Sequence, residues 1–230
     1  MPASLSQTRI SDVGGRAVIA LFLSTFITLF VVIDPPGCAP IFASLTAGAS
    51  NAQRRAMAVR SSMIAAVLLL LFALVGEKLL DTLGISLDAF RVAGGIMVFL
   101  IALEMVFEKR TERREGRADE ISRKAAEEHR PVEDISVFPM AIPMIAGPGS
   151  IATVMLLVSR SHGLQESLIV IAALLAVMLL TVVALLAAGP IMRVLGPKLE
   201  AMITRVLGVL LAALAAQFVI DGVRAAFRLG

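Results

Sequence analysis

Two Pro/Gly-rich stretches, each set inside apolar sequence of membrane length, contain the residues best suited to chemistry. They are Asp34-Pro35-Pro36-Gly37-Cys38-Ala39-Pro40-Ile41-Phe42 and Ala146-Gly147-Pro148-Gly149-Ser150-Ile151-Ala152-Thr153. Pro36-Gly37 in the first matches Pro148-Gly149 in the second, 112 positions later. Because lipid holds no water to satisfy a broken backbone, such stretches must be buried in protein or line a wet cavity. Interruptions at matching places in two halves of a chain are typical of transporter binding sites.

Each break exposes backbone groups that suit a small zwitterion. The carbonyl groups before a break suit a cation or an ammonium group. The helix that starts after it presents open N–H donors and a partial positive charge, which suit a carboxylate. Two facing breaks therefore predict a site for a solute such as an amino acid. The alternative is that Pro and Gly only kink two helices for packing.

Asp34 is a carboxylate directly after the uncharged run 17–33. A carboxylate near the membrane interior is costly and by default functional, so it is predicted to bind a proton or cation. It also suits the N-cap of a helix starting at Pro35 or Pro36. The residues predicted to bind solute or ion are Asp34, Pro35, Pro36, Gly37, Cys38, Pro40, Gly147, Pro148, Gly149, Ser150 and Thr153.

Two of these residues carry alternatives. Ser150 is either a helix cap or a hydroxyl contact to the solute. Cys38, at the place equivalent to Ser150, is either a small packing residue or a reactive thiol. Four further residues in the third and sixth spans are candidates for gating or coupling, with Arg91 and Arg205 alternatively anchoring helices at the lipid surface. These four are Arg91, Glu104, Arg205 and Gln217.

The composition excludes a soluble domain. Of 230 residues, 58% are apolar and 17% charged, and several apolar runs approach the ~20 residues that a helix needs to cross a bilayer. The pattern predicts an all-α polytopic membrane protein. The basic residues of the loops explain the pI near 9.6 without nucleic-acid binding. With one cysteine, two separated histidines and no nucleotide or hydrolase motif, we expect no metal, no cofactor and no enzymatic activity.

Six membrane spans are predicted, at 17–33 (continuing weakly at 39–49), 57–75, 90–107, 137–158 (broken at 143–149), 168–188 and 203–223. They divide the chain into a polar N-terminal tail (1–16), a first repeat (17–107), a charged loop (108–136) and a second repeat (137–230). Arg91-Val92-Ala93-Gly94 matches Arg205-Val206-Leu207-Gly208, which supports a repeat. Three spans per half place the repeats in opposite orientations, as in many secondary transporters.

The positive charges predict the orientation. With both termini in the periplasm, 14 of the 21 Lys and Arg residues lie on the cytoplasmic side, most of them in the loop 108–136. The expected partners are therefore the lipid bilayer and a small solute. The sequence leaves a homo-oligomer open.

The two motifs resemble a known family. Asp34 to Phe42 and Ala141 to Ile151 look like the paired signatures of the MarC family of bacterial inner-membrane proteins. The first motif departs from the commoner form, which has an aliphatic residue at Pro36 and often Asn at Cys38. Some relatives are described as transporters of small neutral amino acids, and the family looks similar to LysE-type exporters. The resemblance implies a small-solute transporter in the bacterial inner membrane.

Two other classes of function stay open. A non-transporting scaffold would act through its cytoplasmic loop 108–136. A membrane enzyme or redox carrier would use Cys38, although dithiol chemistry needs a second thiol.

Overall fold

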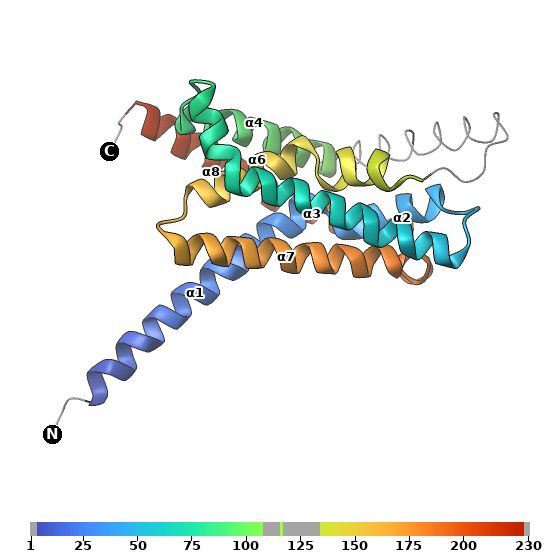
Figure 1. Ribbon diagram of the computed structural model, residues 1–230, viewed down its shortest axis with the longest axis horizontal. Coiled ribbons are helices and arrows are strands. Elements are labelled where there is room, and N and C mark those ends of the chain that lie inside the picture. Colours follow the sequence, from blue (N-terminus) through green and yellow to red (C-terminus); the bar gives the residue numbers. More distant parts are fainter. Residues whose placement is uncertain (1–3, 108–115, 117–133, 228–230) are drawn as a thin grey trace.

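The chain folds as a bundle of helices, as predicted (Figure 1). The computed structural model describes residues 4–107, 116 and 134–227. No strand occurs within these residues. The elements are α1 (Ser4–Ile33), α2 (Pro35–Leu45), α3 (Asn51–Thr82), α4 (Leu87–Val106), the irregular segment η1 (Ser136–Ile145), α6 (Pro148–Ser159), α7 (Leu164–Leu186) and α8 (Ala188–Ala226).

Five stretches are long and apolar enough to cross a membrane: Ala17–Leu45, Asn51–Thr82, Leu87–Val106, Leu164–Leu186 and Met202–Ala226. A sixth forms if η1 and α6, bent by 54° at their junction, count as one span. Large apolar side chains such as Leu74 and Leu179 are more than 65% exposed, as expected for a surface that contacts lipid. The multi-pass membrane architecture is therefore confirmed.

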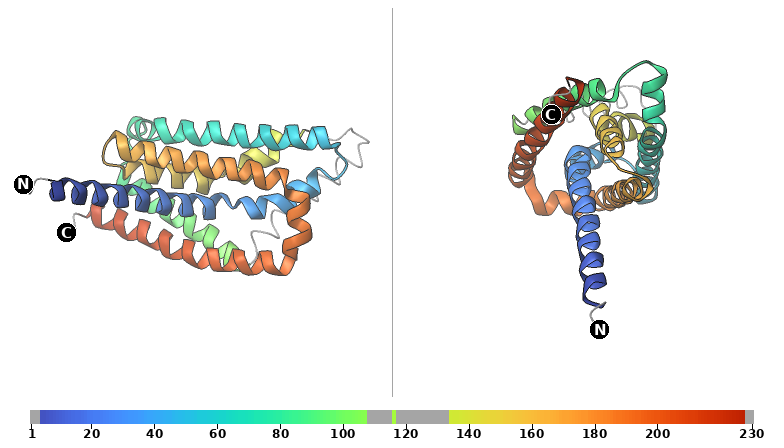
Figure 2. Two further views of the ribbon diagram at one scale, coloured as in Figure 1. Left: turned by 90° about the horizontal axis from the view of Figure 1, so that it is seen from below. Right: turned by 90° about the vertical axis from the view of Figure 1, so that its left-hand side faces the viewer.

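The structure bears differently on the charged loop and on the N-terminal tail. Most of the charged loop 108–136 lies outside the described residues. The polar N-terminal segment is helical, because α1 begins at Ser4. In both Figure 1 and Figure 2, the first part of α1 projects beyond the bundle.

Both termini lie at the same end of the bundle (Figure 2). The connections from α3 to α4 and from α6 to α7 are at that end as well, and we call it the terminal end. The turns from α2 to α3 and from α7 to α8 are at the opposite end, which we call the loop end. The first part of α8 crosses the loop end before the helix runs back along the bundle (Figure 2).

The helices of the bundle pack in several pairs. α7 packs against α1 and α2, and α3 packs against η1 and α6. Likewise α2 packs against α8, and α6 against α4. Two further contacts join α3 to α7 and α4 to α8.

Glycines allow α4 and α8 to approach closely. A Cβ on Gly95 would lie 3.0 Å from the Ala215 carbonyl oxygen of α8. A Cβ on Gly208 would lie 3.1 Å from the Ala102 oxygen of α4. Gly94 instead faces α6, where its Cβ would lie 2.9 Å from Leu156. Small residues at such crossings are typical of packed membrane helices.

Candidate functional site

Asp34 forms the first break. Its backbone adopts the left-handed conformation (φ 57°, ψ 63°), which is uncommon outside glycine. The side chain is 4% exposed, and its Oδ1 accepts a hydrogen bond from the Gly37 N–H at 3.1 Å. Asp34 is therefore the N-cap of α2, as predicted. A Cβ on Gly37 would lie 2.2 Å from the carboxylate, so glycine makes room for this cap.

The prolines and the cap use up the donors at the start of α2. Pro35 and Pro36 have no N–H, and the N–H of Gly37 is taken by Asp34. The expected open donors are therefore absent from these three positions of α2. The Ile33 carbonyl, which loses Gly37 as its helical donor, accepts instead from the Cys38 thiol at 3.7 Å. The fully buried Cys38 thus helps to complete the break.

The second break is built differently. In η1, Phe138 and Ile142 have extended backbone, and the peptide bonds to Pro139 and Pro143 are cis. The N–H of Ala146 donates back to the carbonyl of Ala141 at 2.9 Å. Gly147 follows as the N-cap of α6, and a Cβ there would lie 2.5 Å from the Pro143 oxygen. Only glycine fits this turn without a shift of the backbone.

The start of α6 offers hydrogen-bond donors. Pro148 takes the first helical position, followed by Gly149 and Ser150, whose N–H groups have no partner within the helix. Among the described residues, no side chain caps α6 and no backbone group outside it accepts from these two amides. The alternative of Ser150 as a cap is wrong, since Gly147 occupies that position. The expectation of open donors therefore holds for α6.

Thr153 adds a buried hydroxyl one turn further along α6. The residue has no exposed surface, and its Oγ1 has no hydrogen-bond partner among the described residues. Two more buried hydroxyls share this property, Thr25 of α1 and Ser62 of α3, and the sequence interpretation missed both. Ser61-Ser62 inside the apolar run 57–75 was the available signal. A buried polar atom without a partner points to water or a ligand.

The fold brings the two breaks together. Cys38 and Ala39 from the first break share one buried cluster with Ile145 and Ala146 from the second. A Cβ on Gly149 would lie 3.9 Å from Cγ1 of Val32, two residues before Asp34. Of the other predicted residues, Pro35 is buried, Pro36 and Pro40 are half-buried, and Pro148 is exposed.

Two of the four predicted gating residues belong to a polar cluster near the terminal end. Gln217 donates to Asp221 at 2.7 Å, and Arg160, at the end of α6, pairs with the same carboxylate at 2.5 Å. The Arg160 guanidinium also lies 4.6 Å from the ring centre of Phe218. Arg91 pairs with Asp88 of its own helix at 3.1 Å.

Gly222, next to Asp221 in α8, packs against the Arg91–Asp88 pair of α4. A Cβ on Gly222 would lie 3.0 Å from both the Arg91 Cβ and the Asp88 backbone oxygen. The sequence interpretation did not assign Arg160 or Asp221 to a site. The other two candidates, Glu104 and Arg205, are not part of this cluster. Glu104 is half-buried near the far end of α4, roughly 20 Å along the helix from Arg91. Arg205 is exposed.

Metal ligands do not gather in the described part of the chain, where no three His, Cys, Asp or Glu side chains come together. The expectations of no metal and no cofactor stay predictions.

The fold and the two breaks define an integral, multi-pass helical membrane protein with a polar interruption in each half. A family model described as MarC family integral membrane protein matches residues 19–227, and the chain belongs to this family. The resemblance in the two motifs is thereby confirmed.

Relatives of similar length occur in archaea and bacteria. A UPF0056 membrane protein of Methanocaldococcus jannaschii is 35% identical over 205 residues, which are 89% of this chain and 97% of the relative. One of Archaeoglobus fulgidus is 33% identical over 211 residues, covering 92% and 95%. One of Buchnera aphidicola is 33% identical over 207 residues, covering 90% and 97%. Their names specify neither substrate nor activity, and no solved structure matches the chain.

Proposed function

We propose that this protein is a secondary transporter of a small zwitterionic or neutral solute, such as an amino acid. The observation that carries the proposal is that two helix breaks lie together in the buried interior and present groups of opposite charge preference. The first presents the Asp34 carboxylate, and the second presents the amides of Gly149 and Ser150. An ammonium group suits the carboxylate, while a solute carboxylate suits amides at a helix N-terminus.

Asp34 is also the candidate for coupling transport to a proton or cation. It is the buried carboxylate of this site, and burial makes the energy of its charge sensitive to a bound ion. The Thr153 hydroxyl, one turn after the open amides, is the candidate for a polar contact to the solute.

Six spans arranged as two inverted repeats are part of the proposal. The contacts described above support it. Exchanging α1, α2, α3 and α4 for η1, α6, α7 and α8 turns the contacts of α7 with α1 and α2 into those of α3 with η1 and α6. The same exchange turns the contact of α2 with α8 into that of α6 with α4, and it leaves the contacts of α3 with α7 and of α4 with α8 unchanged. Both termini at one end of the bundle support an even number of spans. We infer further that the terminal end faces the periplasm and the loop end the cytoplasm of a bacterial inner membrane.

Access to the site requires helix movement, because residues of both breaks are buried in one cluster. The polar cluster near the terminal end holds the last turn of α6 to α8 through Arg160 and Asp221. We assign this ion pair to closure of the terminal end. Glu104 and Arg205 remain candidates for coupling toward the loop end.

Uptake into proteoliposomes tests the proposal. Labelled alanine and glycine are offered with and without a proton gradient, in vesicles with protein shown to be folded by circular dichroism. Accumulation above empty vesicles is the expected result. No uptake and no exchange of any small neutral amino acid would remove the proposal.

A further inference from the structure

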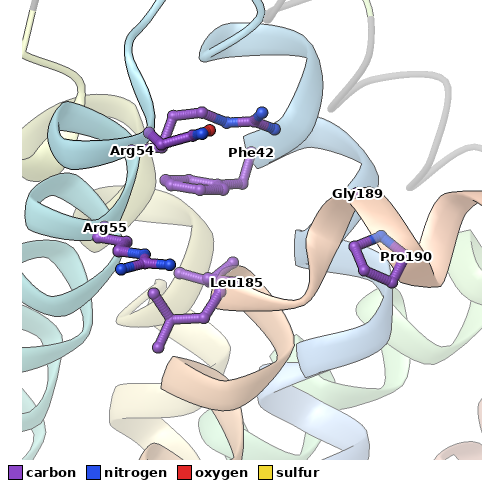
Figure 3. Close-up of a pocket in the computed structure, with 8 residues that line it drawn as sticks. Phe42, Arg54, Arg55, Leu185, Gly189 and Pro190 are labelled. Atoms are coloured by element: carbon purple, nitrogen blue, oxygen red, sulfur yellow. The ribbon is translucent and has the colours of Figure 1, made fainter.

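A pocket of about 250 Å³ opens at the loop end of the bundle, and Asp34 is not among its lining residues (Figure 3). It lies between the end of α2, the start of α3 and the junction of α7 with α8. Its lining residues are Phe42, Asn51, Arg54, Arg55, Leu185, Leu186, Gly189 and Pro190. In Figure 3, Arg54 and Arg55 reach from α3 toward the side where Phe42 and Leu185 lie.

None of the described acidic residues compensates the charge in this pocket. Neither Arg54 nor Arg55 forms an ion pair with any residue that the structure describes, and the lining contains no Asp or Glu. By contrast, Arg60, one helical turn and a half further along α3, pairs with Asp134. Two adjacent guanidinium groups repel each other, so an anion between them is favoured. The Asn51 amide adds another donor at the rim.

The rest of the pocket is apolar and lies at membrane-surface depth. Phe42 and Leu185 are each 1% exposed and form its inner wall. Leu186, 48% exposed, is the last residue of the span Leu164–Leu186. The pocket thus joins the end of an apolar span to a pair of cations, which is the environment of a lipid head group.

We propose that this pocket binds a phosphate group at the membrane surface. Arg54 and Arg55 donate to the phosphate oxygens, since the planar guanidinium matches them with paired hydrogen bonds. Leu186 and Pro190 face the carbon chain or glycerol attached to the phosphate. Basic pockets between membrane helices bind anionic head groups in this way. Both an anionic phospholipid and free phosphate carry the required chemistry, and the site goes beyond the proposed transport.

The first arm of the test measures lipid. The protein is reconstituted with equal amounts of phosphatidylglycerol and phosphatidylcholine, purified in mild detergent and examined by native mass spectrometry. Wild type is expected to retain phosphatidylglycerol about tenfold better than the Arg54→Gln/Arg55→Gln variant does. The control is Arg60→Gln, which removes one positive charge from α3 outside the pocket and is expected to retain lipid like wild type; the single variant Arg55→Gln is its charge-matched counterpart inside the pocket.

The second arm measures free phosphate. Delipidated protein is melted in inorganic phosphate and in chloride of equal ionic strength. A rise in Tm with phosphate in wild type, absent from the double variant, together with no lipid preference, identifies free phosphate as the ligand. The single variant Arg55→Gln guards against misfolding, because this exposed side chain is not needed for packing. The proposal is overturned if removing the pocket arginines changes neither lipid retention nor the phosphate effect, or if Arg60→Gln loses binding equally.

Discussion

The two helix breaks share a Pro-Gly pair yet offer opposite groups to a ligand. At the first, two prolines lack an N–H and the Gly37 amide is capped, so α2 begins with a buried carboxylate. At the second, α6 begins with two amides that no side chain of the described residues caps. One break is suited to a positive group, and the other to a negative one.

The difference comes from the residues that flank the shared pair. At the separation of 112 positions, Asp34 corresponds to Ala146 and Pro35 to Gly147. The Asp34 carboxylate accepts one N–H at the start of α2, and the extra proline removes another. The alanine and glycine at the equivalent positions before α6 accept no N–H through a side chain. A repeated motif can therefore set the position of a break while its neighbours set the charge that it presents.

The largest effect is expected for Gly147→Ala, which attacks the second break itself. The new methyl group would lie 2.5 Å from the Pro143 carbonyl oxygen, a backbone atom that cannot rotate away. We expect a loss of about 3 kcal/mol of stability or failure to fold, measured as Tm and monodisperse yield. Gly116→Ala is the control, because its Cβ meets nothing within 4 Å. Equal Tm values for the two variants would contradict the described geometry.

Asp34→Asn tests the character of the first break. Asn tolerates the left-handed backbone and caps nearly as well as Asp, so the fold is expected to persist. Gradient-driven uptake is expected to fall at least about tenfold because the buried carboxylate charge is gone, while solute exchange survives. Asp34→Ala should cost an additional ~1 kcal/mol of stability through the lost cap. Normal gradient-driven uptake by Asp34→Asn would exclude the coupling role.

Much of this comparison follows from the sequence. Apolar runs and Pro/Gly interruptions predict most of the helices and both breaks. Asp34 is expected as an N-cap, as an ion-binding carboxylate or as both, and the structure shows the cap. The prolines of α2 could have revealed its missing donors, because proline never has an N–H. The pocket at Arg54 and Arg55 could not be predicted from the sequence, because its wall includes Leu185, which lies 130 positions after Arg55 in the chain. That the Thr153 hydroxyl has no hydrogen-bond partner among the described residues depends on tertiary packing, which the neighbouring sequence does not predict.

Thr153→Val probes the second break more gently. Valine has nearly the same shape but no hydroxyl, so removing an unpartnered group should leave Tm unchanged or raise it. If the hydroxyl contacts the solute, the apparent KM for uptake should rise about five- to tenfold. Thr181→Val is the control, because that buried hydroxyl already donates to Val177 of its own helix at 2.8 Å. An unchanged KM would remove Thr153 from the site.

Cys38 allows a smaller test of how the first break is completed. Cys38→Ser keeps a donor for the Ile33 carbonyl, whereas Cys38→Ala removes it and should cost about 1 kcal/mol more. Both variants are expected to transport normally, as measured by uptake per folded protein. Loss of function in Cys38→Ser, with Tm retained, would instead favour thiol chemistry.

The smallest effect concerns the entrance to the second break, where Asp134 precedes η1. Hydrogen bonds from the Ser136 side chain and backbone N–H, with the nearby Arg60 guanidinium, hold the pKa of Asp134 below its usual value of 3.8. The ionised form is therefore stabilised in the folded protein. This contribution is fully present above about pH 4 and is lost as pH falls through the lowered pKa. Because Arg60 and Asp134 are about half exposed, the effect should stay below ~1 kcal/mol.

Thermal melts of wild type and Asp134→Asn between pH 3 and pH 7 measure this contribution. The wild-type Tm should exceed that of the variant at pH 7, and the two curves should converge toward pH 3. A constant difference across this range would show that the carboxylate charge does not hold η1 to α3. The second break would then depend on its glycine and on packing against α3, while the first would still depend on a charge.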